Sequence, residues 1–103
     1  MILEITAEAQ SEIDLAAEWY ESRRPELSRR FYAELRRAYG VIQRQPESFP
    51  RVSLRGSRRH FRQFVLRRFS YYLIYEIDEP HLVLIALPHH RRRAYYWRSR
   101  RAT

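Results

Sequence analysis

The segment Phe61–Leu87, FRQFVLRRFSYYLIYEIDEPHLVLIAL, gives the clearest indication of the fold of this chain. From about Arg59 the residues alternate between two faces, as they do along a strand. One face is expected to hold Phe61, Val65 and Phe69, and the other Arg62, Phe64, Leu66 and Arg68. Apolar runs rich in β-branched and aromatic residues follow at 71–77 and 82–87, and residues 78–81 between them suit a short hairpin connection. The segment therefore predicts three strands in a mostly antiparallel sheet.

Upstream of these strands the apolar residues change to the spacing of helices. They recur at this spacing over residues 7–23, and again from Pro25 to a point just before Pro46. Thr6 is expected to cap the first helix. Pro25 is expected to open the second, because the amide proton that proline lacks would have no partner in a first helical turn. Two adjacent helices with the same spacing of apolar residues predict a helical hairpin.

The alternating run at residues 1–5 predicts one further strand at the N-terminus. The expected order is therefore β-α-α-β-β-β, an α+β fold in which the helical hairpin packs on one face of a small sheet. No stretch rich in Gly, Pro or Ser separates the elements, so residues 1–103 are expected to form a single domain.

Positive charge is concentrated in the second half of the chain. The formal net charge is +8, and because the sequence contains no Lys, all 20 of the residues counted as Lys or Arg are Arg. Residues 1–50 hold 7 Arg against 9 Asp and Glu, whereas residues 51–103 hold 13 Arg against 3. A GC-rich gene would explain the choice of Arg over Lys, but not the net charge. The asymmetry predicts a docking surface for an anionic partner, either nucleic acid or an acidic protein.

Several classes of site lack the residues that they need. Cysteine is absent, so neither a disulfide nor a thiolate metal site can form. The histidines show no spacing typical of metal ligands; they are His60, His81, His89 and His90. Two glycines are too few for a glycine-rich phosphate loop, and no cofactor is expected. Early acidic residues and short apolar runs argue against secretion and membrane insertion, so a cytoplasmic location is expected.

Two segments, FSYYLIYE at 69–76 and HHRRRAYYW at 89–97, resemble the RelE/ParE superfamily, and in particular its ParE-like, plasmid-stabilisation branch. The matching residues of the first segment are Phe69, Tyr71, Leu73 and Tyr75, and those of the second are His89, Arg91, Arg92 and Trp97. Ser70 and Ala94 stand where the family usually has proline. The order of the elements and the chain length are also similar to those of the family.

The resemblance implies a toxin of a type II toxin-antitoxin system, neutralised by an acidic antitoxin and reaching operator DNA only through that antitoxin. The antitoxin is expected to bind one strand face, through Arg62, Phe64, Leu66 and Arg68. ParE-like members trap DNA gyrase on cleaved DNA and break no bond themselves. The resemblance therefore implies a gyrase inhibitor, whose target-binding residues are expected to be Arg91, Arg92, Arg93, Tyr96 and Trp97.

Two alternatives stay open. RelE-like members cut messenger RNA on the ribosome, which requires groups that move protons and groups that hold the charge of the phosphorane. For such an endoribonuclease the candidate residues are Arg62, Arg68, Arg91, His89 and Tyr96. The second alternative is a non-toxic basic domain that binds nucleic acid.

Two residue types also have ordinary structural explanations. His89 and His90 are neighbours at the end of a strand, so they should point to opposite faces, and one of them is expected to be structural. Trp97 is expected to anchor the C-terminal tail on the sheet.

Overall fold

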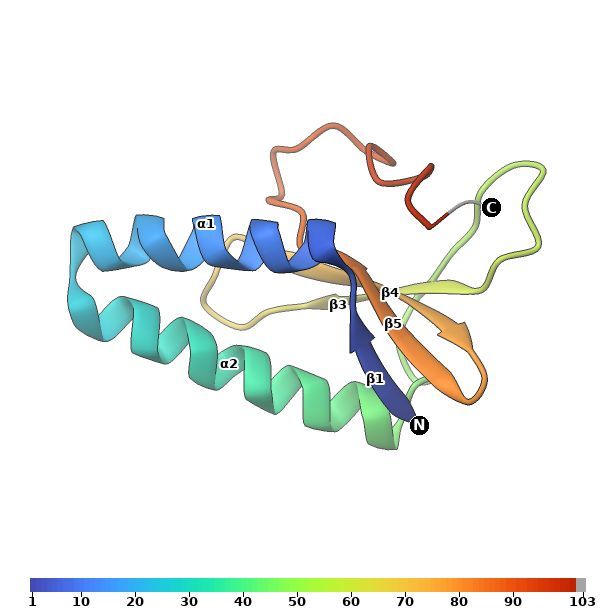
Figure 1. The fold of residues 1–103 in the computed structure, drawn as a ribbon, viewed down its shortest axis with the longest axis horizontal. Helices are drawn as coiled ribbons and strands as arrows, with labels where there is room; N and C mark the ends of the chain where they lie inside the picture. The colour runs from blue at the N-terminus through green and yellow to red at the C-terminus, as the bar shows by residue number, and fades with distance from the viewer. Residues whose placement is uncertain (102–103) are drawn as a thin grey trace.

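The computed structural model describes residues 1–101 and contains two helices and five strands. In chain order the elements are β1 (Ile2–Ile5), α1 (Ala7–Arg23), α2 (Pro25–Arg44), β2 (Arg51–Val52), β3 (Phe61–Val65), β4 (Tyr72–Asp78) and β5 (His81–Ala86). The predicted order of strand, helical hairpin and three strands is confirmed, and β2 is an addition to it (Figure 1).

The ends of the helices follow from local chemistry. Thr6 caps α1, because its hydroxyl oxygen accepts a hydrogen bond from the Ala9 amide at 3.1 Å. Arg24 is extended, with φ −158° and ψ 134°, and separates the helices, and Pro25 opens α2. Each helix buries one stripe, and the two stripes are Ala9, Ile13, Ala16, Ala17 and Tyr20 on α1 and Ser28, Phe31, Leu35, Ala38 and Ile42 on α2. Among residues 1–101, no helix is long and apolar enough to cross a bilayer.

The sheet has five strands in the order β1-β5-β4-β3-β2, rather than the three that the sequence predicts. β1 is a parallel edge strand that pairs with β5, while β2, β3, β4 and β5 pair in antiparallel fashion. β2 contains two residues, too few for an alternating pattern to be recognised. The extent of β3 is also corrected, since the strand ends at Val65 and Arg68 has a positive φ of 65° in the connection to β4.

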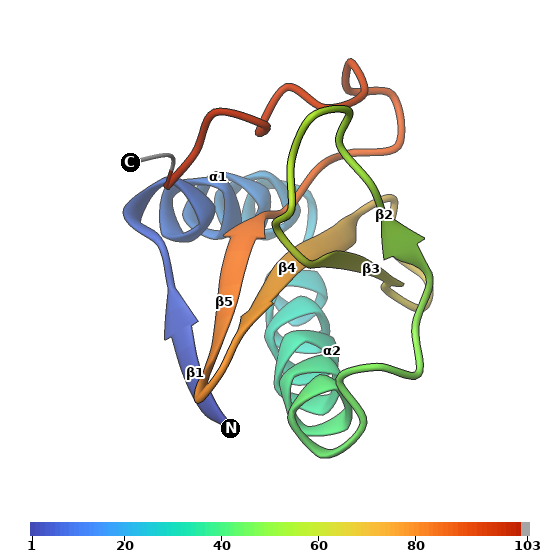
Figure 2. The same cartoon turned by 90° about the vertical axis from the view of Figure 1, so that its right-hand side faces the viewer.

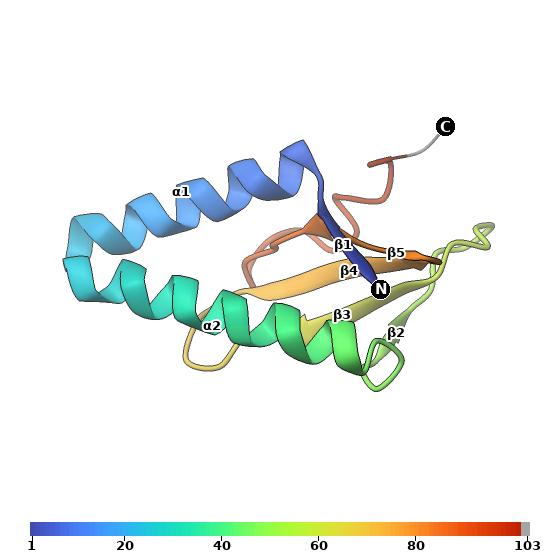
Figure 3. The same ribbon diagram turned by 60° about the horizontal axis from the view of Figure 1, so that its bottom comes forward.

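The two faces of the sheet are covered by different parts of the chain. The helical hairpin packs on one face, where its stripes meet side chains such as Leu73 and Leu84. The opposite face carries a smaller apolar cluster, in which Trp97 from the C-terminal tail packs against strand residues. Figure 2 shows this tail beside the loop between β2 and β3, and Figure 3 shows the helices diverging from their connection alongside the strands. The tail and that loop form the second cover of the sheet.

Candidate functional site

Trp97 anchors the C-terminal tail on the sheet, as expected from the sequence. Its side chain is 2% exposed, and its ring centroid lies 4.9 Å from that of Phe61 in an edge-to-face arrangement. This burial does not fit the expectation that Trp97 contacts a target directly, because strand residues already cover the ring. Trp97 therefore positions the tail and leaves little of its own ring exposed.

Glu12 of α1 fastens the start and the end of the tail. Its carboxylate accepts hydrogen bonds from the Leu87 amide at 3.0 Å, from the Tyr96 hydroxyl at 2.7 Å and from Arg100 at 2.9 Å. Burial opposes the ionisation of Glu12, but these bonds outweigh it and lower the pKa of the carboxyl below its ordinary value. Burial and the bond to Glu12 raise the pKa of Tyr96. The Tyr96 hydroxyl is thus held as a structural donor.

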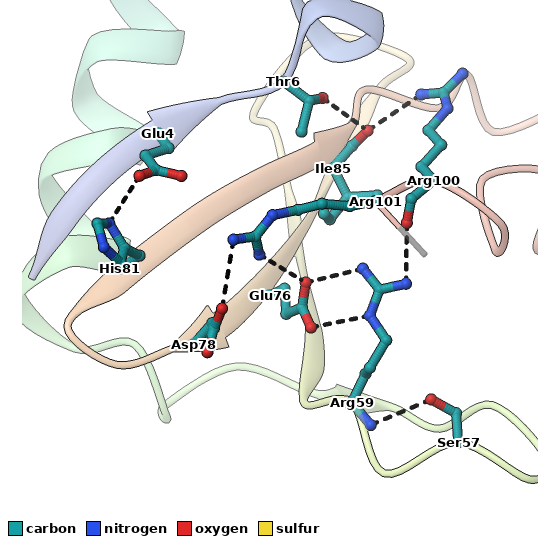
Figure 4. A network of polar contacts seen from close by, with 10 residues as sticks. All are labelled: Glu4, Thr6, Ser57, Arg59, Glu76, Asp78, His81, Ile85, Arg100 and Arg101. Carbon is teal, nitrogen blue, oxygen red and sulfur yellow. Dashed lines mark hydrogen bonds and ion pairs between the residues drawn. The ribbon is translucent and has the colours of Figure 1, made fainter. Parts of the chain in front are cut away.

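Glu76 of β4 joins the loop after β2 to the tail, as Figure 4 shows. The Arg59 guanidinium donates to it at 2.9 Å and 2.8 Å in a two-pronged bond, and Arg101 donates at 3.2 Å. Arg59 also donates to the Arg100 carbonyl at 2.9 Å. Burial opposes ionisation of Glu76, yet the bonds from Arg59 and Arg101 lower the pKa of this carboxyl. Glu76 and Glu12 together fasten the tail.

The tail should consequently loosen in acid. A carboxylate whose pKa is lowered on folding stabilises the fold above its ordinary value of 4.5, and that contribution is lost as the pH falls through the lowered value. When the pH is lowered from about 6 to about 3, the urea concentration at the unfolding midpoint should fall for the wild type, and it should fall less for Glu76→Gln. At neutral pH this variant should be less stable by about 1–3 kcal/mol, as is typical when charged hydrogen bonds are removed.

Glu47→Gln is the matched control, because Glu47 is an exposed carboxylate that belongs to neither the Glu12 nor the Glu76 hydrogen-bond network. This control should keep the pH dependence of the wild type. A Glu76→Gln variant whose midpoint falls as steeply as that of the wild type would show that Glu76 does not fasten the tail.

The predicted basic surface is only partly free. Arg59, Arg100 and Arg101 are tied to the carboxylates of the chain itself. The consecutive residues Arg91, Arg92 and Arg93 are exposed and, within residues 1–101, form no ion pair. The Arg92 guanidinium lies 3.9 Å from the centroid of the Tyr96 ring, which keeps it near the fastened part of the tail. A free cationic group therefore remains on a firmly held segment.

The two neighbouring histidines face opposite sides, as predicted. His89 meets the Tyr71 ring edge-on at 5.2 Å, whereas His90 stacks on Tyr72 at 5.4 Å. The Nδ1 atom of His89 accepts a hydrogen bond from the Arg91 amide at 3.0 Å, so it shapes the turn that leads into the arginines. His89 therefore has a structural role in the turn.

Of the five residues proposed for RNA cleavage, His89 and Arg91 are joined in one turn, whereas the other three contact separate parts of the fold. Arg62 donates to the Phe49 carbonyl at 2.7 Å and to His60 Nε2 at 2.9 Å, beside the passage out of α2. Arg68 lies in the connection between β3 and β4, whereas Tyr96 is bonded to Glu12 of α1. None of these contacts joins the three residues into one site.

The strand face proposed for the antitoxin is not an open surface. Phe64 is 7% exposed and Leu66 is 2% exposed, because both belong to the core beneath the helices. The Phe64 ring also meets Phe49 edge-on at 4.7 Å. The alternation separated Phe61 from Phe64 correctly, but it was wrong for Phe69, which lies beyond the end of β3 and packs on the helix side with Phe64. The assignment of Phe64 and Leu66 to a partner was also wrong, because the helical hairpin of the same chain covers them.

A basic depression that was not predicted lies between α2 and the connection from β3 to β4. Its lining includes Leu27, Arg30, Arg37, Arg67, Arg68 and Phe69. Glu34 fixes its floor, because its carboxylate accepts from the Arg37 guanidinium at 2.8 Å and from the Arg67 amide at 2.6 Å. Arg68 was expected to contact a partner, but only the spacing of Arg30 and Arg37, two turns apart on one helix face, could have indicated the contribution of α2.

One family model matches most of the chain. The family model described as "ParE toxin of type II toxin-antitoxin system, parDE" matches residues 3–95. Among solved structures, the chain is similar to one titled "Chromosomal ParDE TA system from P. aeruginosa", with a TM-score of 0.72 and 15% identity, over 86% of this chain and 95% of that chain. At this identity the structural likeness shows the fold alone. No curated protein sequence matches the chain.

Proposed function

The chain belongs to the ParE toxin family of type II toxin-antitoxin systems, and from this premise we propose that it inhibits DNA gyrase and is neutralised by a cognate acidic antitoxin. Gyrase is favoured over messenger RNA as the target because of the hydrogen bonding and the pKa of the Tyr96 hydroxyl. Its hydroxyl is bonded to the Glu12 carboxylate at 2.7 Å, and its pKa is raised. A group held in this way is poorly suited to trade protons with a substrate near neutral pH.

The proposed target-binding group is the exposed run Arg91–Arg93. The turn at His89 precedes this run and the buried ring of Trp97 follows it, so both of its ends are held. Because the backbone of this segment is already held, less conformational entropy is lost when its three side chains bind a partner. The absence of ion pairs on these residues within the described part of the chain leaves their charges available to an acidic surface.

The proposed antitoxin-binding surface is the basic depression beside α2. Arg68, one of the residues expected from the sequence, remains in this proposal, whereas the buried Phe64 and Leu66 leave it. The depression combines guanidinium groups with the apolar side chains of Leu27 and Phe69. Such a mixture suits an acidic segment that also carries apolar residues.

Induced expression of the chain alone should stop growth and raise the DNA-damage response, and the purified protein should inhibit supercoiling by gyrase. Co-expression of the small acidic product of a neighbouring gene should restore growth. If growth stops while gyrase still supercoils DNA and messenger RNA is cut at codon boundaries, the target is the ribosome and not gyrase.

Tyr96→Phe separates the two mechanisms further. It keeps the ring beneath Arg92 and removes only the hydroxyl, at a cost of about 1.5–3 kcal/mol for one hydrogen bond to a charged group. Gyrase inhibition should survive this change. Loss of toxicity in a Tyr96→Phe variant that remains folded would favour proton transfer by Tyr96 and hence RNA cleavage.

A further inference from the structure

A second groove lies on the covered face of the sheet, between the loop that follows β2 and the C-terminal tail. Its lining includes Leu54, Arg55 and Ser57 from the loop and Ala94, Tyr95 and Arg98 from the tail. The two segments lie side by side in Figure 2. None of the target-binding or antitoxin-binding residues proposed above lines this groove.

The groove is cationic and contains no acid of its own. Arg55 and Arg98 are exposed, and within residues 1–101 neither forms an ion pair. The carboxylate of Glu76, which reaches the loop, is already occupied by Arg59 and Arg101. Within the described residues neither guanidinium group has a carboxylate as counter-charge, as is typical of a site for an anionic ligand.

Tyr95 presents a flat apolar ring beside these charges. Its side chain is 44% exposed, and its backbone has a φ of 61°, which is uncommon for a residue other than glycine. The Tyr95 carbonyl accepts hydrogen bonds from the Arg98 amide at 3.0 Å and from the Arg98 guanidinium at 3.2 Å. These bonds hold the Arg98 guanidinium close to the backbone of Tyr95, and both residues line the groove.

The wall opposite the tail is rigid. Arg59 makes two hydrogen bonds to Glu76 and a third to the Arg100 carbonyl, and its guanidinium lies 4.5 Å from the centroid of the Phe61 ring. The loop and the tail are therefore joined below the groove, and the groove is present before any ligand arrives. A preformed site avoids the entropic cost of ordering its walls on binding.

We propose that this groove binds a single strand of nucleic acid, with a base stacked on Tyr95 and the neighbouring phosphates held by Arg55 and Arg98. An exposed aromatic ring flanked by guanidinium groups is the arrangement that binds single strands without regard to sequence, because every base has a flat π face. An acidic peptide would use the charges but leave the ring without a partner. The inference goes beyond gyrase inhibition, which does not require the toxin itself to contact nucleic acid.

The test uses the purified full chain and a fluorescein-labelled oligo(dT), with binding followed by anisotropy at several salt concentrations and no gyrase present. Tyr95→Ala should weaken binding about tenfold, and Tyr95→Phe should keep it, because stacking needs only the ring. Tyr32→Ala is the matched control, since Tyr32 is 40% exposed on α2. This control should bind as the wild type does.

Charge is tested by Arg55→Glu against Arg36→Glu, which changes the net charge equally but lies on the exposed side of α2. Arg55→Glu should weaken binding. It should also make the negative slope of log K against log salt shallower, by roughly 0.7 for each phosphate that the variant no longer holds. Equal weakening by Arg36→Glu, or wild-type binding by Tyr95→Ala, would overturn the proposal. So would duplex DNA binding as tightly as the single strand, or an acidic peptide binding where the oligonucleotide does not.

Discussion

Replacing Trp97 with alanine is expected to lower the free energy of unfolding by about 3–5 kcal/mol, the range typical of a buried aromatic residue. The ring is 2% exposed and fills the second face of the sheet against Phe61, so its removal leaves a cavity where the tail crosses the strands. For a domain of this size each kcal/mol lowers the Tm by roughly 4–8 °C, so the midpoint should fall by about 12 °C or more. Thermal and urea denaturation would measure both quantities.

The matched control is Trp19→Ala, which removes the other tryptophan of the chain. Trp19 is 52% exposed on α1, and its contact with the Arg23 guanidinium at 4.7 Å is on the surface. The expected loss for this control is about 0.5 kcal/mol or less. Equal midpoints for Trp97→Ala and the wild type would show that the tail is not anchored through this ring.

Replacing Arg91, Arg92 and Arg93 together with alanine is expected to abolish growth arrest and to weaken gyrase inhibition about a hundredfold, if each cation contributes about 1 kcal/mol at the interface. The three side chains are exposed and form no ion pair within the described residues, so the fold should remain intact. Circular dichroism and the denaturation midpoint would check the fold, and a supercoiling assay would measure inhibition. Trp97 must be kept in this variant, because its removal would confuse a loss of binding with a loss of stability.

A second triple variant, with alanine at Arg29, Arg36 and Arg44, removes the same charge from α2 and should stay toxic. Two results would contradict the assignment of the target surface. One is full toxicity of the variant at 91–93, and the other is an equal loss of toxicity in the variant on α2.

Much of the fold follows from local signals that the sequence displays openly. Thr6 caps α1 and Pro25 opens α2 through interactions within a few residues, so the limits of the helices were predictable. The opposite directions of His89 and His90 follow from the alternation of an extended chain. The anchoring of the tail by Trp97 was also predicted correctly.

The incorrect predictions concern strand pairing and side-chain burial, both of which depend on contacts between distant parts of the chain. β1 pairs with β5 in parallel, and because register partners such as Ile2 and His81 lie 79 positions apart, no local pattern encodes that partner. Phe64 and Leu66 read as one face of a strand, but whether the helices or a partner would cover that face depended on the packing of the hairpin. The basic depression brings α2 and the connection after β3 together for the same reason.

Local sequence patterns predicted both helices, the strands other than β2, the ParE resemblance and the excess of arginine. Which arginines are free depended on the fold, because Glu12 and Glu76 neutralise Arg59, Arg100 and Arg101 over separations of 17 to 88 residues. A side chain carries its charge wherever it lies in the chain. Its availability to a partner depends on which carboxylate the fold brings within hydrogen-bonding distance, and that is a property of the packed molecule.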